Sequence, residues 1–196
     1  LGTQKNYAQD VSESYANEIE HIFDHLKHFR ILTATQVLQS GAAAVNETIS
    51  ACWLTENGLK GSFPGHYPGE PVMVTENNYR LKLFNGDQGI FLKFINPESR
   101  EVELKAVFEV DGIFKTFYQN ELQHLQTAYA ITVHKSQGSE YDHIAIILPA
   151  FSRGKRKPET ELRNIGELIN REMLYTAMTR AKKSVLILGN KRVLEE

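Results

Sequence analysis

The sequence predicts an α/β protein in which a parallel sheet with flanking helices carries an inserted small antiparallel β-barrel. Helix-compatible segments at 10–30 and 43–56 precede a block of short strands at 71–122, and apolar strands and a helical stretch follow it. Strands with few polar residues are typical of a parallel sheet that helices cover on both faces. A chain of 196 residues is long enough for one sizeable domain with a smaller insertion.

The first part of the α/β domain is expected over residues 1–70. Apolar residues at helical spacing predict an amphipathic helix over 10–30, and a short β-like run follows at Phe29–Thr35. A second helix is predicted over 43–56, where Asn57-Gly58 supplies a stop signal. Residues 58–70 are rich in Gly and Pro and read as a connector.

The inserted barrel is expected over residues 71–122. The segments PVMVTEN, RLKLF, GIFLKFI, EVELKAVFEV and GIFKTFY have the period of strands. Asn85-Gly86 and Asp111-Gly112 lie between such segments and tolerate the positive φ that tight hairpins require. Most aromatic side chains here are expected in the core, with stacking on nucleic-acid bases as the alternative, among them Tyr79, Phe84 and Phe91.

The second part of the α/β domain is expected over residues 123–196. Strands are predicted near Ala128–Val133, Ile144–Leu148 and Ser184–Leu188. A polar loop at Ser152–Pro158 and a helical stretch over Glu161–Lys183, interrupted near 164–166, lie between the second and third strands. The alternation of strand and helix supports a parallel sheet in this part of the chain.

The net charge of the chain bears on whether it binds nucleic acid. A net charge of −2 and a pI near 6.4 give no global sign of a nucleic-acid binder, so any such contact must come from local basic patches. Candidate patches are Arg153–Lys157, Arg180 with Lys182 and Lys183, and Lys191 with Arg192. The first of these, taken alone, is more simply a solvated loop.

Cysteine usage and hydropathy favour a cytoplasmic chain. A single cysteine, Cys52, rules out an internal disulfide and fits a reducing compartment. The longest apolar stretch, around Ile144–Phe151, is much shorter than the roughly 20 residues that a membrane span needs. The first residues, LGTQKNYAQD, have neither a basic segment nor an apolar segment of the kind that targets proteins for secretion. We therefore expect no membrane association.

Two stretches carry most of the chemical information. In AYAITVHKSQGSEYD (Ala128–Asp142), a polar loop at 134–140 follows a buried strand, the position at which open parallel sheets bind ligands. Gly138 allows close approach of the backbone to a ligand, although spacing alone also fits a solvent-exposed turn. In EMLYTAMTRAKKSV (Glu172–Val185), a helix is expected that places Thr179 and Arg180 away from its apolar face.

Together these two stretches resemble motifs V and VI of the superfamily 1 helicases, most closely the RecD subunit of bacterial exodeoxyribonuclease V. FRILTATQVLQSGAAAVNETI resembles the motif IV strand and the following helix of the same family, in which Arg30 and Gln36 are implied to approach the nucleotide. PVMVTENNYRLKLFNGDQGI resembles the insertion between motifs IV and V. The resemblance implies a RecA-like sheet, the fold of P-loop NTPases, with an inserted barrel of the Src-homology kind.

The resemblance also implies roles for individual residues. Arg180 corresponds to the motif VI arginine, which reaches from the second motor domain to the γ-phosphate of a nucleotide held by the first. A planar guanidinium is suited to stabilise charge on phosphoryl oxygens. Gln137, Gly138 and Glu140 are implied to face the nucleotide, with Glu140 accepting a hydrogen bond from the ribose. The residues implied to face single-stranded DNA are Thr132, His134 and Lys135.

The sequence contains no G-x-x-x-x-G-K-[ST], the loop that cradles nucleotide phosphates, and no Asp-Glu box for magnesium. We therefore expect the second half of an ATP-driven motor, with ATP and Mg²⁺ bound mainly by a first motor domain outside this chain. No metal ligand is assigned to the chain, and it is expected to hydrolyse no ATP alone. The family further implies 5′→3′ movement on single-stranded DNA, and RecB- and RecC-like partner subunits.

Two alternatives remain open from the sequence. The first is a related motor, either a conjugative relaxase-helicase or a stand-alone RecD-like helicase. The second belongs to another class and is a non-catalytic module whose barrel docks protein partners. Binding to single-stranded DNA at low and moderate salt separates the second alternative from the motors, because a protein-docking barrel has no need to bind DNA.

Overall fold

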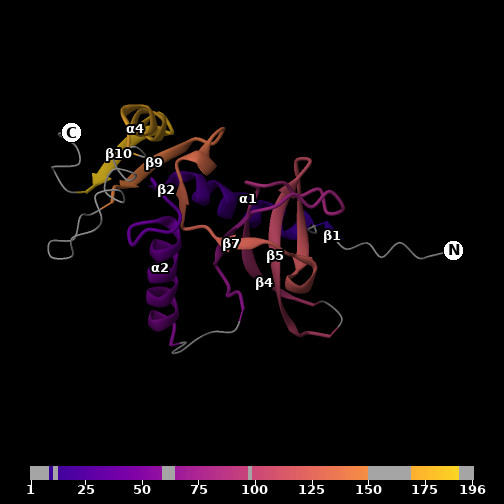
Figure 1. Cartoon of the computed structure of the whole chain (residues 1–196). Helices are drawn as coiled ribbons and strands as arrows, with labels where there is room; N and C mark the ends of the chain where they lie inside the picture. The colour runs from indigo at the N-terminus through magenta and orange to yellow at the C-terminus, as the bar shows by residue number, and fades with distance from the viewer. Residues whose placement is uncertain (1–8, 11–12, 59–64, 97–98, 150–168, 190–196) are drawn as a thin grey trace. The chain divides into compact units, whose positions relative to one another are not determined.

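The computed structural model describes residues 9–10, 13–58, 65–96, 99–149 and 169–189 (Figure 1). By its internal contacts the chain divides into two compact units. One unit contains Leu1–Ile22 and Ser50–Ala128, and the other contains Phe23–Ile49 and Tyr129–Glu196. The chain passes from one unit to the other within two helices and once more at the bond between residues 128 and 129.

In the described residues, the second unit contains a four-stranded sheet whose strands all run parallel. The order across the sheet is β8 (Ala130–Thr132), β2 (Phe29–Thr33), β9 (Tyr141–Ile147) and β10 (Ala181–Leu188). One or more apolar side chains of each of the three first-named strands are fully buried, among them Leu32, Ile131 and Ile146. The parallel sheet predicted from the apolar runs is thereby confirmed.

The described helices are α1 (Glu13–His28), α2 (Ala42–Glu56) and α4 (Arg171–Met178). The predicted helix over 43–56 is confirmed as α2. The predicted helix over 10–30 is shorter at both ends, because Asp10 lies in a strand and Phe29 begins β2, where residues 29–33 pair with 143–147. The polar loop at Ser152–Pro158 and residues 161–168 of the helical stretch expected over Glu161–Lys183 lie outside the described residues.

The end of α4 differs from the prediction. The helix stops at Met178 instead of continuing through Lys183, since Ala181 already pairs with Tyr141 as the first residue of β10. Thr179 is the C-cap, and the Arg180 N–H donates to the Ala177 carbonyl at 3.1 Å. Arg180 therefore lies in a tight turn from helix to strand and not on a helix face.

The first unit contains, within its described residues, a six-stranded antiparallel sheet. Its order is β1 (Gln9–Asp10), β6 (Ile113–Tyr118), β5 (Val102–Val110), β4 (Gln88–Ile95), β3 (Pro71–Val74) and β7 (Leu125–Thr127). The turn predicted at Asp111-Gly112 is confirmed: both residues have positive φ, 54° and 76°, and Val110 pairs with Ile113 across the turn.

The sheet of the first unit is open in the described residues, since β1 and β7 are its two ends, so the predicted closed barrel is not seen. The segment RLKLF is also not a strand. Lys82 has a φ of 57°, which interrupts the extended backbone, and only an isolated bridge joins Asn78 to Leu83. Leu81 and Leu83 nevertheless point into the core, which explains why their alternation resembled a strand.

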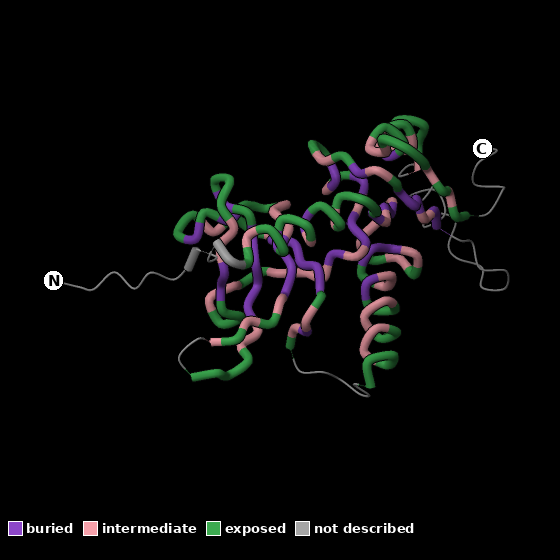
Figure 2. The backbone as a smooth tube through the Cα atoms, turned by 180° about the vertical axis from the view of Figure 1, so that it is seen from behind, coloured by how far each residue is buried: buried purple, intermediate pink, exposed green. Residues whose placement is uncertain are grey.

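The core of the first unit is formed by side chains from the strands and from this turn. Figure 2 marks the buried residues in purple along the backbone. Its members are Val72, Val74, Leu81, Leu83, Phe91, Ala106, Phe108, Val110 and Phe117. Gly89 of β4 is required by packing, because a Cβ there would lie 2.5 Å from the Val107 carbonyl oxygen and 2.7 Å from the Phe108 ring. Among the described helices, none is long and apolar enough to cross a membrane.

Candidate functional site

The residues singled out in the sequence lie at the two opposite ends of the strands of the parallel sheet. We call the side where the strands end the carboxyl edge and the side where they begin the amino edge. Thr132 pairs with Thr33, which in turn pairs with Ile147, so Thr132 lies at the edge where the strands end. Glu140 directly precedes Tyr141, the first residue of β9, and Arg180 directly precedes Ala181, the partner of Tyr141 in β10. Glu140 and Arg180 therefore lie together at the edge where the strands begin.

The loop from 134 to 140 was expected to lie entirely beyond the carboxyl ends of the strands. Only its beginning does so, because the 3₁₀ turn η2 (His134–Ser136) follows β8 and the chain then returns to the start of β9. Gln137 and Gly138 belong to the chain segment that runs from the carboxyl edge back to the start of β9. Gly138 has a φ of +84°, and no neighbouring atom lies within 4 Å of the position that a Cβ would take, so backbone conformation and not space favours glycine there.

Arg180 is held in place by main-chain carbonyls. Its Nε donates to the Thr176 carbonyl at 3.3 Å, and its Nη1 donates to the Ser139 carbonyl at 3.4 Å. The Arg180 carbonyl accepts from the Tyr141 N–H at 2.8 Å. In the part of the chain that the structure describes, no carboxylate pairs with this guanidinium, which is partly buried. A guanidinium has five N–H donors, so most of its donor capacity is left for an anionic ligand.

Glu140, at the same edge, is exposed and forms an ion pair with Lys182, whose Nζ lies 3.3 Å from Glu140 Oε2. Gln137 is exposed as well. The loop that carries both residues is fastened by Ser136, which is fully buried and whose hydroxyl donates to the Val133 carbonyl at 2.7 Å. Glu140 and its partner Lys182 thus lie at the same edge as Arg180.

The opposite edge presents hydroxyl, imidazole and ammonium groups. Thr132 Oγ1 accepts from the Lys135 N–H at 3.3 Å, and the Val133 N–H donates to the Thr33 carbonyl at 3.0 Å. Desolvation lowers the pKa of the Lys135 ammonium below its ordinary value. His134 is exposed. This edge therefore combines a partly buried ammonium with a hydroxyl and an imidazole group.

Sequence reasoning missed Thr35 as a member of the carboxyl edge. Thr35 and Gln36 directly follow β2 in the chain, and Thr35 Oγ1 and Gln36 Oε1 are buried without a hydrogen-bond partner in the described residues. Gln36 lies at the edge away from Arg180. Arg30 is buried in the second unit. Its guanidinium lies 5.2 Å from the centre of the Tyr141 ring, and its Nη2 donates to the Leu26 carbonyl.

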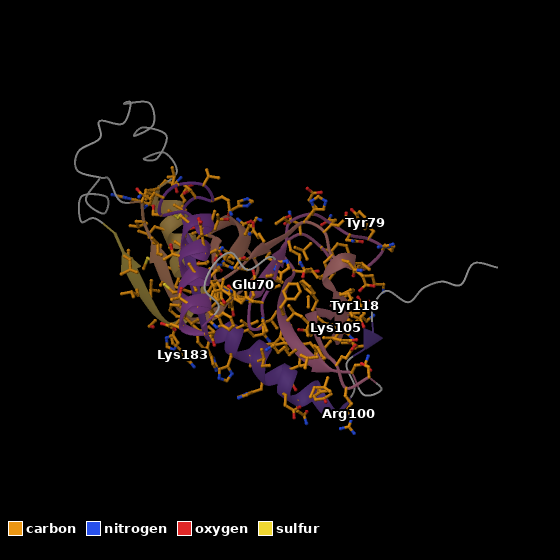
Figure 3. All side chains as sticks on the ribbon, turned by 90° about the horizontal axis from the view of Figure 1, so that it is seen from below. Glu70, Tyr79, Arg100, Lys105, Tyr118 and Lys183 are labelled. Carbon is orange, nitrogen blue, oxygen red and sulfur yellow. The ribbon has the colours of Figure 1, made fainter. Side chains whose placement is uncertain are left out.

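The aromatic side chains of the first unit divide between core and surface. Phe91 is fully buried, as expected, but Tyr79 (labelled in Figure 3) and Phe84 are 77% and 46% exposed. Their rings meet edge to face, with centroids 6.1 Å apart. The basic patches at Arg153–Lys157 and at Lys191 with Arg192 lie outside the described residues.

Comparison with known proteins connects these features to one family. Residues 127–188 match the model of the UvrD-like helicase C-terminal domain. The RecD subunit of the RecBCD enzyme from Mycolicibacterium smegmatis is 33% identical over 164 residues, which are 84% of this chain and 26% of that protein. The RecD subunit from Haemophilus influenzae is 29% identical over 190 residues, 96% of this chain and 25% of that protein. The chain thus spans about a quarter of the length of these relatives.

Two further matches lie outside the RecD subunits. The ATP-dependent RecD2 DNA helicase from Deinococcus radiodurans is 30% identical over 123 residues, 63% of this chain and 14% of that protein. Among solved structures, a Pif1 helicase from Candida albicans gives a TM-score of 0.46 at 12% identity, covering 94% of this chain and 53% of that one.

Proposed function

The chain is a relative of the RecD-type superfamily 1 helicases, and we propose that it is the second motor domain of such an ATP-dependent 5′→3′ DNA helicase. The matched segment, 127–188, includes both sheet edges of the candidate site. In this function, ATP and Mg²⁺ are held mainly by a first motor domain that is not part of this chain, and this chain completes the nucleotide site. Alone, the chain hydrolyses no ATP.

The single observation that carries the proposal is the guanidinium of Arg180. It is oriented by two long hydrogen bonds to carbonyls, at 3.3 and 3.4 Å, and neither neutralises its charge. Phosphoryl transfer is catalysed mainly by positioning and by stabilising charge on the transferred group, which is what such an arginine supplies. When bound, ATP would supply the phosphoryl group and Mg²⁺ would offset part of its negative charge. Arg180 would contact the phosphoryl oxygens, Glu140 would accept a hydrogen bond from the ribose, and Gln137 and Gly138 would face the nucleotide.

The carboxyl edge is proposed to contact single-stranded DNA through Thr132, His134 and Lys135. Lysine and hydroxyl groups bind the sugar–phosphate backbone without reading its sequence. Binding is therefore expected to be largely independent of sequence and to weaken as salt rises. Because DNA and nucleotide are assigned to opposite ends of one short strand–loop–strand unit, a shift of that unit would couple the two sites.

The cellular setting follows the RecD relatives as part of the proposal. RecB- and RecC-like subunits are the proposed partners, in an exodeoxyribonuclease V that acts in DNA repair and recombination in the cytoplasm. The stand-alone alternative has its own support in the similarity to the RecD2 helicase of Deinococcus radiodurans. The exposed pair Tyr79 and Phe84 leaves the first unit a surface suited to binding, either to bases or to a protein.

The test uses the intact protein that contains this chain together with its first motor domain. Arg180→Ala is expected to lower DNA-stimulated ATP turnover by about three to five orders of magnitude while single-stranded DNA binding is retained. Arg180→Lys is expected to restore little, because a lysine cannot hold both carbonyls and a phosphate at once. Arg171→Ala, an exposed arginine at the start of α4, is the matched control. Unchanged turnover in Arg180→Ala would reject the assignment.

A further inference from the structure

Strand β10 contains a bulge directly after Arg180. Ala181 pairs with Tyr141 and Ser184 pairs with His143, so Lys182 and Lys183 together lie opposite the single residue 142 of β9. Successive side chains of a regular strand point to opposite faces. A bulge re-aims one of them and is frequent beside functional sites. Here it lets two consecutive lysines reach two acidic side chains, Glu140 and Asp142, on the neighbouring segment.

The two ion pairs of the bulge differ in strength. Lys183 Nζ lies 2.8 Å from Asp142 Oδ2, and the same oxygen lies 2.8 Å from His28 Nδ1, at the end of α1. The Asp142 side chain is only 18% exposed. By contrast, Lys182 Nζ lies 3.3 Å from Glu140 Oε2, and both side chains are more than half exposed. Exposed pairs of the second kind are weak and exchange readily with other partners.

The stronger pair lies next to the main-chain bond that fixes Arg180. The Tyr141 N–H donates to the Arg180 carbonyl at 2.8 Å, and Asp142 is the next residue. On the other strand, Lys183 is three positions after Arg180 and is labelled in Figure 3. The Lys183–Asp142 pair therefore joins β9 and β10 close to the hydrogen bond that anchors the Arg180 turn. Only residues 181 and 182 separate Lys183 from Arg180.

The weaker pair, Lys182–Glu140, involves the carboxylate that the proposed function assigns to the nucleotide ribose. The Lys182 ammonium contacts one oxygen of Glu140 and offsets part of its negative charge, so a ribose hydroxyl would meet a weaker acceptor while this ion pair is formed. Releasing Lys182 frees a cation at the same edge as Arg180 and two positions after it. The bulge thus places the shorter ion pair, whose carboxylate is mostly buried, beside the arginine, and the longer, exposed ion pair at the proposed ribose acceptor.

We propose that the Lys182–Lys183 bulge is a two-part clamp: Lys183, through Asp142, is a positioning residue for Arg180, and Lys182 competes with the nucleotide ribose for Glu140. This inference rests on the proposed function of Arg180 and Glu140. It gives two adjacent lysines opposite effects on catalysis. Replacing Lys183 misaligns the arginine and lowers kcat, whereas replacing Lys182 uncovers Glu140 and lowers the KM for ATP.

The test compares Lys183→Met, Lys182→Met and Lys183→Arg in the intact protein, with Lys93→Met on an exposed position of β4 as control. Lys183→Met is expected to lower kcat at least tenfold with little change in KM, and Lys183→Arg is expected to restore most of it. Lys182→Met is expected to lower KM and the dissociation constant of a fluorescent ATP analogue by up to about fivefold, the most that an exposed pair supplies. Equal effects of the two methionine variants would overturn the clamp.

A second measurement separates the clamp from the proposed function. Hydrogen exchange of the Tyr141 amide, measured on this chain, reports directly on its bond to the Arg180 carbonyl. Lys183→Met is expected to speed this exchange and Lys182→Met to leave it unchanged. If Arg180→Ala abolishes turnover but Lys183→Met changes neither turnover nor exchange, the clamp alone is rejected. If Arg180→Ala leaves turnover intact, the proposed function is rejected and the clamp with it.

Discussion

The side-chain amide of Asn46 pairs with both main-chain groups of Ala130, donating to the carbonyl at 2.9 Å and accepting from the N–H at 2.7 Å. Both residues are buried. Ala130 begins β8, an end strand of the parallel sheet, and one amide from α2 supplies the two hydrogen bonds that a further strand would make. This contact fixes the strand that leads directly into Thr132, His134 and Lys135.

Asn46→Ala is therefore expected to lower the free energy of unfolding by about 2–4 kcal/mol, because it leaves a buried N–H and a buried carbonyl unpaired. Asn46→Asp is expected to cost at least as much at neutral pH, since a carboxylate would face the Ala130 carbonyl. Urea unfolding measures both. Thr48→Ala, on the exposed side of α2, is the control. A loss below about 1 kcal/mol in Asn46→Ala would show that water replaces the amide.

Local patterns predicted those elements in which local and tertiary preferences agree. The apolar strands, the helix over 43–56 and the Asp111-Gly112 turn all have signals within a few residues. The turn containing Leu81 and Leu83 was wrongly predicted to be a strand. Leu81 and Leu83 are buried on either side of Lys82, as in a strand, but Lys82 has a positive φ. The end of α4 also misled. Residues 181–183 suit a helix, and only pairing with β9 makes them a strand.

Resemblance proposed the members of the candidate site but not their geometry. It selected Arg180, Glu140 and Lys135, whereas their separation onto opposite sheet edges depends on where each strand begins and ends in the folded sheet. The bulge at Lys182–Lys183 depends on register between two strands, which is set only when both are folded. For the same reason, Asp142 carries no signal in the sequence that singles it out from other acidic residues.

Gly138→Ala is expected to destabilise the second unit by about 1–2 kcal/mol, the cost of a left-handed backbone for a residue with a Cβ. Gly138 has a φ of +84°, and its surroundings are open, so the cost is conformational and not steric. Gly138→Asn is expected to recover about half of the loss, because Asn tolerates this region better than Ala. Thermal unfolding of the three proteins gives the comparison. Equal stability of Ala and Gly at this position would mean that the loop relaxes to another conformation.

Stability in acid is expected to depend on Asp142. Lys183 donates a hydrogen bond that is the main cause of the lowered pKa of this carboxyl, and His28 adds to the effect. A carboxyl whose pKa is lower in the folded state stabilises the fold above its unfolded pKa of about 4, and this contribution is lost as pH falls through the lower folded value. Asp142→Asn and Lys183→Met should each remove it. Both variants are then expected to show a shallower loss of stability than the parent protein between about pH 5 and about pH 2.

Substitutions of aromatic side chains in the first unit should change the free energy of unfolding by amounts that depend on how deeply each side chain is buried. Phe91 is fully buried in the core beside Ala106, so Phe91→Ala is expected to lower the free energy of unfolding by about 3–5 kcal/mol. Tyr79 is 77% exposed and its hydroxyl makes only a 3.4 Å hydrogen bond to Asn77, so Tyr79→Ala is expected to change stability by less than about 0.5 kcal/mol.

The comparison also tests what the exposed ring is for. The polar side chains around Tyr79 hold the turn itself: Asn77 Oδ1 accepts from the Asn85 N–H, and Asp87 accepts from the Phe84 N–H. Removing the ring therefore leaves its support intact. If Tyr79→Ala weakens single-stranded DNA binding at unchanged stability, the turn contacts bases. If binding is unchanged, the ring of Tyr79 does not contact bases. A large loss of stability would contradict the exposure that the structure assigns to Tyr79.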